Sequence, residues 1–464
     1  MSLATRRSVL RGACRIGLGA GAAMMMPPLV GQALGRTEGY KALVCVFLDG
    51  GLDADDVLIP YDEASYADYA QVRAPLHEAY AVQGASRARA DLLPLTGPDG
   101  ARPDGRAFAA PPEMPELARL FGAGRAAIVA NAGPLEEPTT ALSYASGGAR
   151  LPPKLFSHAD QLRGQMRLSA GGGETGWGGR LMDAMAGAGR DPYSGLATSN
   201  ADPFWLYGAE RQPLFVTSVD PAPVVGTGGN IFASAEASRI FEEHLLDLEP
   251  RAPGPFAADF ASRQAAGVAA QNRVAAAFAT SDAGAAFADG TGSLADQLAI
   301  VARAISLRDQ MGVTRQVFHV GLRGFDTHQD QANELLPRLR AIDTGLGLFT
   351  DWLDAQGLAD DVTVFTASDF GRTLQPNATG TDHGWGGHQI VVGGAVRGGR
   401  VLGEVPPAGL GHGQDIGRGR IVPTTASEQV AVPLARWLGV AETDIPAVFP
   451  RADRFDLSAI DLFG

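Results

Sequence analysis

Three aspartates follow short apolar runs of the kind that form buried strands. Asp49 ends the run LVCVFL, Asp326 follows QVFHVG after a short turn, and Asp369 follows VTVFTA. A carboxylate at a buried strand end is unfavourable unless a positive group lies beside it. Carboxylates gathered from several strand ends therefore indicate a bound cation or a site that processes an oxyanion.

Histidines lie in the same loops as two of these aspartates. His328 comes two residues after Asp326, and His383 and His388 bracket a Gly-rich segment after Asp369. Asp and His ligands without cysteine suit Zn²⁺, Mn²⁺ or another ion held by oxygen and nitrogen, with Mg²⁺ and Ca²⁺ also possible. The expected ligands of one or two divalent ions are Asp49, Asp326, His328, Asp369, His383 and His388.

Each of these residues also has a structural interpretation. An Asp at a strand end can cap a helix, and a loop His can hydrogen-bond the backbone. His319 lies inside a strand, and three other histidines lack an acidic motif nearby. We expect these four to be structural: His77, His244, His319 and His412. Two ions held together would clamp an oxyanion and activate a nucleophile.

The elements that must position these residues alternate between strands and helices. Apolar runs predict strands at 43–48, 127–130, 316–321, 362–367 and 389–392, and possible short strands at Phe204–Tyr207 and Leu214–Val216. Helical spacing predicts helices at 115–121, 235–247, 294–305, 335–353 and 427–438, the last with Ser427 as N-cap. This alternation predicts a three-layer α/β/α fold with a doubly wound, mostly parallel sheet.

We expect one domain rather than two. Residues 34–464 contain no clean linker, so the Gly-, Ala- and Pro-rich stretch at about 132–292 is interpreted as irregular insertions. In an open α/β sheet, ligands bind beyond the carboxyl ends of the strands, where the three aspartates are expected.

Composition excludes several classes of function. The 464-residue chain has a formal net charge of −13, which argues against binding to nucleic acid. Lys41 and Lys154 are the only lysines among 38 basic residues, and no GxxxxGK[ST] phosphate loop occurs. No G-x-S-x-G motif occurs either, which disfavours an α/β-hydrolase triad.

Residues 1–33 read as a twin-arginine signal peptide. Thr5-Arg6-Arg7-Ser8-Val9-Leu10-Arg11 precedes a Gly- and Ala-rich apolar stretch and small residues at a cleavage position. We therefore expect a periplasmic or secreted protein that meets the twin-arginine translocase and has no membrane span when mature. Removing residues 1–33 deletes four arginines and no acid, giving −13 − 4 = −17, and leaves Cys45 as the only cysteine. Glycines that imitate a dinucleotide motif lie only in this segment, which disfavours an oxidoreductase.

Several motifs carry a resemblance to a family. Leu155-Phe156-Ser157-His158-Ala159-Asp160-Gln161, Gly176-Trp177-Gly178-Gly179-Arg180, Gly324-Phe325-Asp326-Thr327-His328 and Ser368-Asp369-Phe370-Gly371-Arg372-Thr373 resemble the domain of unknown function 1501 family. So do Gly380–His388 and Val422–Gln429. That family resembles a distant branch of the alkaline phosphatase and sulfatase superfamily, which implies an alkaline-phosphatase-like fold.

The resemblance implies roles for individual residues. Asp49 matches the first-strand Asp of the superfamily, and Asp326 with His328 resembles an Asp–His pair on one ion. Asp369 matches the Asp of a Ser-Asp-His-Gly turn, but Phe370 stands where that turn has His. His383 or His388 would then supply the missing imidazole.

The resemblance also implies a hydroxyl nucleophile and an oxyanion-binding arginine. Ser157 is the first choice of nucleophile, and Thr139 and Thr140 are the alternatives. Arg372 or Arg180 would bind the charged oxygens through a planar guanidinium.

Two functions of different classes follow. The first is an exported metal-dependent hydrolase of phosphate or sulfate esters, acting on a small anionic ester. The alternative is a catalytically inactive envelope or periplasmic protein that keeps the fold as a binding or scaffold platform.

Overall fold

The computed structural model describes residues 39–98, 105–168, 174–185, 192–199, 203–221, 234–246, 254–288, 290 and 293–464. The expected signal peptide, residues 1–33, lies outside these described residues. By internal contacts, Gly39–Gly464 forms one unit. Within the described ranges, no helix combines the length and the apolar character needed to cross a bilayer.

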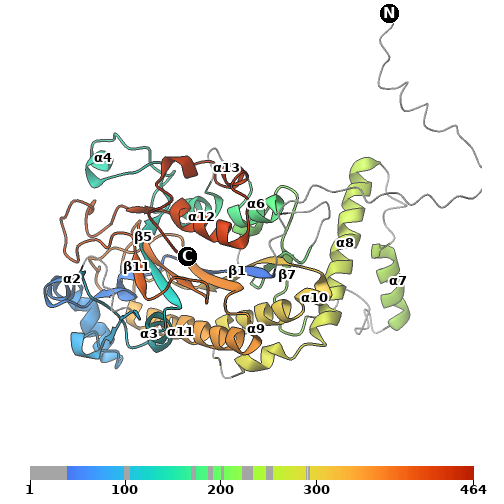
Figure 1. Ribbon diagram of the computed structural model, residues 1–464, viewed down its shortest axis with the longest axis horizontal. Helices are drawn as coiled ribbons and strands as arrows, with labels where there is room; N and C mark the ends of the chain where they lie inside the picture. The colour runs from blue at the N-terminus through green and yellow to red at the C-terminus, as the bar shows by residue number, and fades with distance from the viewer. Residues whose placement is uncertain are drawn as a thin grey trace, which may run out of the picture. The chain divides into compact units, whose positions relative to one another are not determined.

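A large, mostly parallel sheet forms the centre of this unit (Figure 1). β1 (Lys41–Asp49) pairs in parallel with β8 (Arg315–Arg323) on one side and β9 (Val362–Ser368) on the other. β10 (Gly387–Val392) is the exception, because it runs antiparallel to β9 and to β5 (Ala126–Gly133). The strand order is β11-β5-β10-β9-β1-β8-β6-β7, with β12 beside β5.

The remaining strands are short. In the central sheet they are β6 (Gly195–Ala197), β7 (Leu214–Phe215), β11 (Arg400–Leu402) and β12 (Thr425–Ala426). A separate small sheet has the order β2-β4-β3, formed by β2 (Ile59–Pro60), β3 (Leu93–Pro94) and β4 (Phe108–Ala110).

Helices cover both faces of the sheet (Figure 1). Alternate residues of β1 point to opposite faces, so Val44 and Val46 join one buried cluster while Leu43 and Cys45 join another. The first cluster is closed by α3 (Pro115–Gly122), α9 (Ser293–Ser306), α10 (Arg308–Met311) and α11 (Gln331–Gln356). The second is closed by α5 (His158–Arg167), α6 (Trp177–Ala184), α12 (Ser427–Leu438) and α13 (Ile445–Val448). A strand buried on both faces explains the continuous apolar run LVCVFL.

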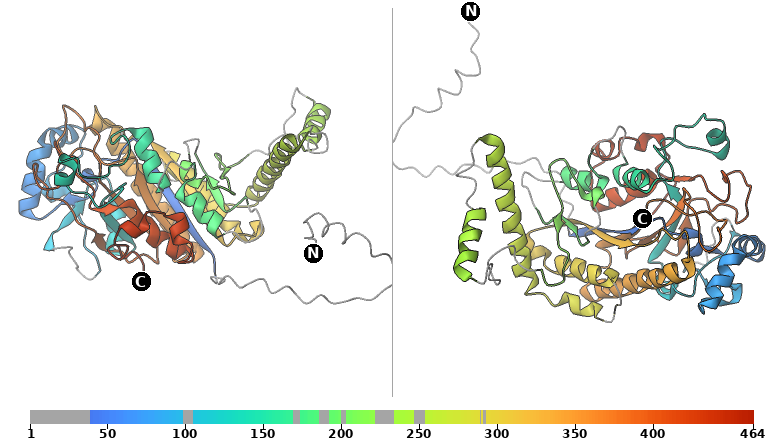
Figure 2. Two further views of the ribbon diagram at one scale, coloured as in Figure 1. Left: turned by 90° about the horizontal axis from the view of Figure 1, so that it is seen from above. Right: turned by 180° about the vertical axis from the view of Figure 1, so that it is seen from behind.

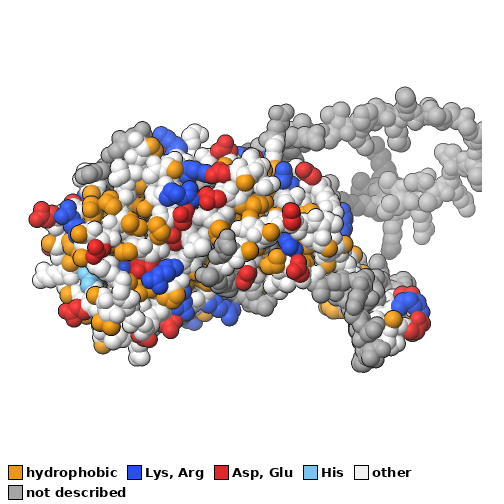
Figure 3. All heavy atoms as spheres, turned by 90° about the horizontal axis from the view of Figure 1, so that it is seen from below, with side chains coloured by type: hydrophobic (Ala, Val, Ile, Leu, Met, Phe, Trp, Pro, Cys, Tyr) orange, Lys and Arg blue, Asp and Glu red, His pale blue; other side chains and the backbone are white. Residues whose placement is uncertain are grey.

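The other helices lie at the two ends of the unit. α2 (Glu63–Val82) and α4 (Ala141–Ala145) lie at one end, and α7 (Ala235–Leu246) and α8 (Pro255–Phe278) project at the other (Figure 2). On the face seen from below, acidic and basic side chains are interspersed, with no large area of one sign (Figure 3).

The expected fold class is confirmed at the level of a mixed α/β fold with a mostly parallel central sheet. Two local predictions are wrong. Phe204–Leu206 is a 3-10 helix rather than part of a strand, and it places Trp205 in the core against Trp177. Ala426, rather than Ser427, is the N-cap of α12, because the Ser427 hydroxyl donates to Gln165 Oε1 instead.

The stretch expected to be irregular contains a long helix. α8 has 24 residues and lacks a broad apolar stripe, which is why hydrophobic periodicity did not indicate it. Its alanine content gives it high intrinsic helix propensity, a signal that periodicity alone does not measure.

Candidate metal centre

The three strand-end aspartates come to the same edge of the sheet. The register pairs Asp49 with Arg323 on β8 and Leu48 with Ser368 on β9. The carboxyl ends of these three strands therefore lie side by side at one edge of the sheet. The loops that follow are tied together: the backbone N–H of Gly50 donates to Asp369 Oδ1 at 3.3 Å, and that of Phe325 donates to Asp49 O at 3.1 Å. Carboxyl ends of parallel strands thus converge as the sequence requires.

Arg372 binds these loops to one another. Its guanidinium is fully buried and donates to the carbonyls of Gly51, Phe325 and Thr381 at 2.9, 2.9 and 3.1 Å. Nη2 also donates to Asp326 Oδ1 at 2.6 Å. Arg372 therefore positions the loops of the site. The role expected from the sequence, binding of substrate oxygens, requires an exposed guanidinium, whereas in this structure the side chain is buried.

Arg180, the other arginine considered for substrate oxygens, is also engaged with the backbone. It donates to Val448 O and Thr175 O, each at 2.8 Å, and to Arg167 O. Burial lowers its pKa to about 10.

Asp326 Oδ1 lies among three imidazole nitrogens. The Nε2 atoms of His158, His383 and His328 lie 3.4, 3.2 and 3.2 Å from this oxygen. Nε2 of His328 is also 2.8 Å from Nε2 of His383. One ligand atom from each of His158, Asp326 and His383 fits within 4.8 Å of the others. Tetrahedral Zn²⁺ with bonds near 2 Å places its ligand atoms about 3.3 Å apart, so the observed separations suit one ion.

The second nitrogen of each imidazole is held by an acceptor. Nδ1 of His158 lies 2.7 Å from Asp369 Oδ2, and Nδ1 of His383 lies 2.7 Å from the carbonyl oxygen of Phe156. Nδ1 of His328 lies 3.3 Å from Asp382 Oδ1. Ionised carboxylates and carbonyls only accept, so these contacts place the proton of a neutral imidazole on Nδ1 and leave a lone pair on Nε2.

Lone pairs that face a carboxylate repel it unless a cation lies between them. Nε2 of His158 is buried and has no hydrogen-bond partner among the described residues. The donor set of nitrogen and carboxylate oxygen, with every outer nitrogen anchored, therefore fits a divalent ion such as Zn²⁺ or Mn²⁺.

The pKa values follow from the same contacts. Burial alone raises the pKa of Asp326, but the hydrogen bond and charge of Arg372 outweigh it and bring the pKa to about 2. The hydrogen bond to Asp369 raises the pKa of His158, whereas burial lowers the pKa of His383. The carboxyl group of Asp326 is thus ionised over the whole physiological range.

Phe370 forms an apolar wall of the cluster. Its ring centroid lies 4.7 Å from that of His158 and 4.5 Å from that of His383. Gly51 permits this packing, because a Cβ there would lie 2.5 Å from the Phe370 ring. The Phe370 ring thus packs against two of the imidazoles.

Three of the six expected ligands lie outside this cluster: Asp49, His388 and Asp369. Asp49 is half-buried, and its Oδ2 lies 3.5 Å from Arg323 Nε, while burial and then the charge of Asp369 raise its pKa. His388 accepts the backbone N–H of Asn131 at 3.0 Å on Nδ1, and burial lowers its pKa to about 4. The structure brings Asp326, His328 and His383 together, and places Asp369 behind them as the partner of His158.

None of the three hydroxyls considered as nucleophiles contacts the cluster among the described residues. Ser157 Oγ donates to Asp160 Oδ2 at 2.7 Å, and Thr139 Oγ1 donates to Glu137 O at 2.8 Å. Thr140 Oγ1 accepts the backbone N–H of Ser143 and caps α4.

Sequence reasoning missed the roles of His158 and Asp382. No role was assigned to His158 from the sequence, although it starts α5 two residues after Phe156, whose φ of 71° lies in the left-handed region. Asp382 precedes His383 in the Gly-rich loop and accepts from Arg418 Nη1 at 2.6 Å. An Asp–His pair at adjacent positions was the available signal.

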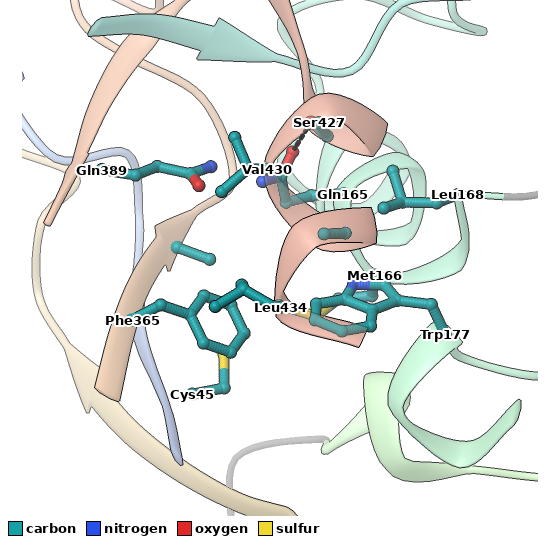
Figure 4. Close-up of a pocket in the computed structure, with 12 residues that line it drawn as sticks. Cys45, Gln165, Met166, Leu168, Trp177, Phe365, Gln389, Ser427, Val430 and Leu434 are labelled. Carbon is teal, nitrogen blue, oxygen red and sulfur yellow. Dashed lines mark hydrogen bonds between the residues drawn. The ribbon is translucent and has the colours of Figure 1, made fainter. Parts of the chain in front are cut away.

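A separate small pocket lies between α5, α12 and β9 (Figure 4). It has a volume of about 10 Å³ and is lined by Cys45, Trp177 and Phe365, with Gln165 accepting from Ser427 at one end. A cavity of this size holds at most one water, so it offers no second ligand site.

Comparisons with known proteins give little beyond the family. No curated protein matches this chain. A solved structure titled "Crystal structure of Ps i-CgsB in complex with k-i-k-neocarrahexaose" is 10% identical, with a TM-score of 0.32, covering 88% of this chain and 74% of that chain. At this TM-score the likeness supports no statement about fold or chemistry.

A family model described as "Protein of unknown function (DUF1501)" matches residues 40–417. The match includes every residue of the cluster and most of the central sheet. This chain therefore belongs to the DUF1501 family.

Proposed function

We propose that this protein is a metal-dependent hydrolase of phosphate or sulfate esters, exported by the twin-arginine route to the periplasm or beyond. The observation that carries the proposal is the convergence of three imidazole Nε2 atoms on Asp326 Oδ1, each imidazole being anchored through Nδ1. The export motif at Thr5–Arg11 supports the location.

His158, Asp326 and His383 would hold the ion, with His328 as a further ligand or an adjacent imidazole. A divalent ion bound there supplies Lewis-acid polarisation of an ester oxygen. A set of three protein ligands leaves room for substrate, which is the arrangement of catalytic rather than structural sites.

The chain's own residues prepare the site before substrate arrives. Asp369 orients His158 and holds its proton on Nδ1, and Arg372 keeps Asp326 ionised and in place. The Phe370 ring packs against the rings of His158 and His383 and restricts their orientation. The resemblance to the alkaline phosphatase and sulfatase superfamily supports an ester of phosphorus or sulfur as substrate.

The test combines elemental analysis with a panel of phosphate monoesters, phosphate diesters and sulfate esters. We expect about one divalent ion per chain in the purified protein and turnover of at least one ester class. His383→Gln should lose both, whereas His412→Gln, whose ring Nδ1 accepts only the Gln414 backbone N–H among the described contacts, should keep both. Bound metal with no turnover of any ester would favour the alternative of an inactive binding or scaffold protein. Absence of metal would overturn the proposal.

A further inference from the structure

Arg372 is buried and Arg180 is bound to backbone carbonyls, so neither guanidinium is free to bind substrate oxygens at the proposed site. Cations near the cluster are mostly paired with acids. Arg418 pairs with Asp382 at 2.6 Å, Arg323 lies 3.5 Å from Asp49, and Lys154 lies 3.8 Å from Asp160.

Arg420 differs from these cations. Its Nε donates to the carbonyl oxygen of His383 at 2.9 Å, and its guanidinium lies over the Phe156 ring at 5.4 Å. In the part of the chain that the structure describes, no acidic side chain pairs with it. One edge of the guanidinium is therefore fixed to the backbone that carries a cluster histidine, while its two Nη groups have no acceptor among the described residues.

Hydrogen bonds hold the loop that carries Arg420 in place. Asp415 accepts the backbone N–H groups of Gly417 and Gly419 at 2.7 and 2.9 Å. Gly419 O accepts from Leu374 N at 3.0 Å, and Gly386 N donates to Ile421 O at 3.0 Å. Hydrogen bonds on both sides of Arg420 thus fix its backbone beside the Gly-rich loop of the cluster.

We propose that Arg420 forms an oxyanion subsite that makes the enzyme select monoesters over diesters; this inference rests on the proposed hydrolase function. The two Nη groups form a planar fork that binds two terminal oxygens of a tetrahedral anion. An ion held by His158, Asp326 and His383 would bind one more oxygen. Three terminal oxygens exist on a phosphate or sulfate monoester, but only two on a phosphate diester.

The Phe156 ring under the guanidinium supports this role. A guanidinium stacked on an aromatic face loses little freedom when it binds an anion, because its plane is already set. Phe156 O also accepts a hydrogen bond from His383 Nδ1, so Phe156 contacts both the Arg420 guanidinium and a cluster imidazole.

The experiment measures binding of inorganic phosphate by calorimetry to the full, metal-loaded chain. Arg420→Gln should bind phosphate tenfold to a hundredfold more weakly than wild type, the range expected for lost charge-assisted hydrogen bonds. Its metal content and melting temperature should match wild type. Arg420→Lys should fall between the two, because it keeps the charge and loses the fork. Arg163→Gln is the matched control: it removes an exposed arginine from α5, whose first residue is His158, and should bind phosphate like wild type.

Outcomes of this experiment separate the inference from the proposed function. Equal phosphate affinity of Arg420→Gln and wild type, or wild type that binds no phosphate although it holds metal, overturns the subsite. Loss of metal from Arg420→Gln also overturns it, since the residue would then be structural. Arg420-dependent phosphate binding without turnover of any ester supports the subsite and refutes the hydrolase. Turnover that prefers diesters, or monoester turnover with KM unchanged in Arg420→Gln, keeps the hydrolase and overturns the subsite.

Discussion

His158 and Asp369 are 211 residues apart in sequence, and Nδ1 of His158 lies 2.7 Å from Oδ2 of Asp369. The Asp369 side chain is fully buried, and its other oxygen accepts the N–H of Gly50. This one carboxylate thus joins the start of α5 to the ends of β1 and β9. It fixes the imidazole so that Nε2 faces Asp326 and His383.

Asp369→Asn should weaken metal binding without unfolding the protein. An amide keeps the size of the side chain but is a weaker acceptor than a carboxylate for the N–H at Nδ1 of His158. Changes to such outer partners of ligating histidines typically weaken metal binding about tenfold to a hundredfold. Competition with a chromogenic chelator measures this affinity. Asp351→Asn, which changes an exposed acid paired with Arg119, is the control and should leave it unchanged. Wild-type metal affinity in Asp369→Asn would contradict the role given to this contact.

Gly50→Ala should destabilise the protein and the site together. Gly50 has a φ of 119°, and a Cβ there would lie 2.5 Å from the backbone nitrogen of Asp326. Gly84 has a φ of 73° but open space around a Cβ. Gly84→Ala should therefore show only backbone strain, about 1 kcal/mol, whereas Gly50→Ala adds a clash of about 1–3 kcal/mol. Chemical denaturation of both variants separates the two effects. Equal losses of unfolding free energy in the two variants would show that the close contact between the Gly50 and Asp326 loops does not require glycine at position 50.

The strands and their ends could be predicted from sequence because a strand buried on both faces leaves an unbroken apolar run. LVCVFL and VTVFTA became the core of β1 and β9, with Asp49 ending the first and Asp369 following the second. The antiparallel direction of β10 could not be predicted, since a short apolar run carries no information on direction. That direction also turns His388 toward Asn131 of β5 and away from the cluster.

A buried ionic network under the β1 loop should contribute strongly to folding. Arg73 and Asp53 form an ion pair with both side chains fully buried, and Gln331 Nε2 also donates to Asp53. Arg73→Met leaves the Asp53 charge buried without its partner, which costs about 3–5 kcal/mol. Arg119→Met removes a half-exposed pair with Glu116 and should cost less than about 1 kcal/mol. The free energy of unfolding in urea measures both. A smaller loss of unfolding free energy in Arg73→Met than in Arg119→Met would contradict the stabilising role given to the buried Arg73–Asp53 pair.

His319 should make the protein acid-sensitive. Burial lowers its pKa from 6.5 to about 3, and neither ring nitrogen has a hydrogen-bond partner among the described residues. Because its pKa is lower in the folded state, protonation favours unfolding. The contribution of neutral His319 to the free energy of unfolding is fully present above pH 6.5. Below pH 6.5 this contribution falls by about 1.4 kcal/mol per pH unit until the folded-state pKa is reached.

His319→Leu removes this titration while keeping a side chain of similar size. The fall in melting temperature between pH 6.5 and 4.5 should be shallower in the variant than in wild type. Burial also lowers the pKa of His77 and of His388 to about 4, so some acid sensitivity remains in the variant. Identical slopes for variant and wild type would show that His319 does not titrate as a buried imidazole.

The site was only partly predictable for a related reason. Asp326, His328 and His383 were recognisable because their types and loop positions suit a cation. The role of His158 depends on its contact with Asp369, which is far away in sequence. The position of His158 next to Ser157 gives no information on that contact. Arg372 resembled a substrate-binding residue by type, but its burial among carbonyls depends on how three loops meet.

The most direct test is a crystal of the full chain equilibrated with Zn²⁺ or Mn²⁺ and measured at the absorption edge of that metal. We expect an anomalous peak within about 2.2 Å of His158 Nε2, His383 Nε2 and a carboxylate oxygen of Asp326. A map without a peak among these atoms, or with a peak bound only by other residues, would contradict the proposed metal site.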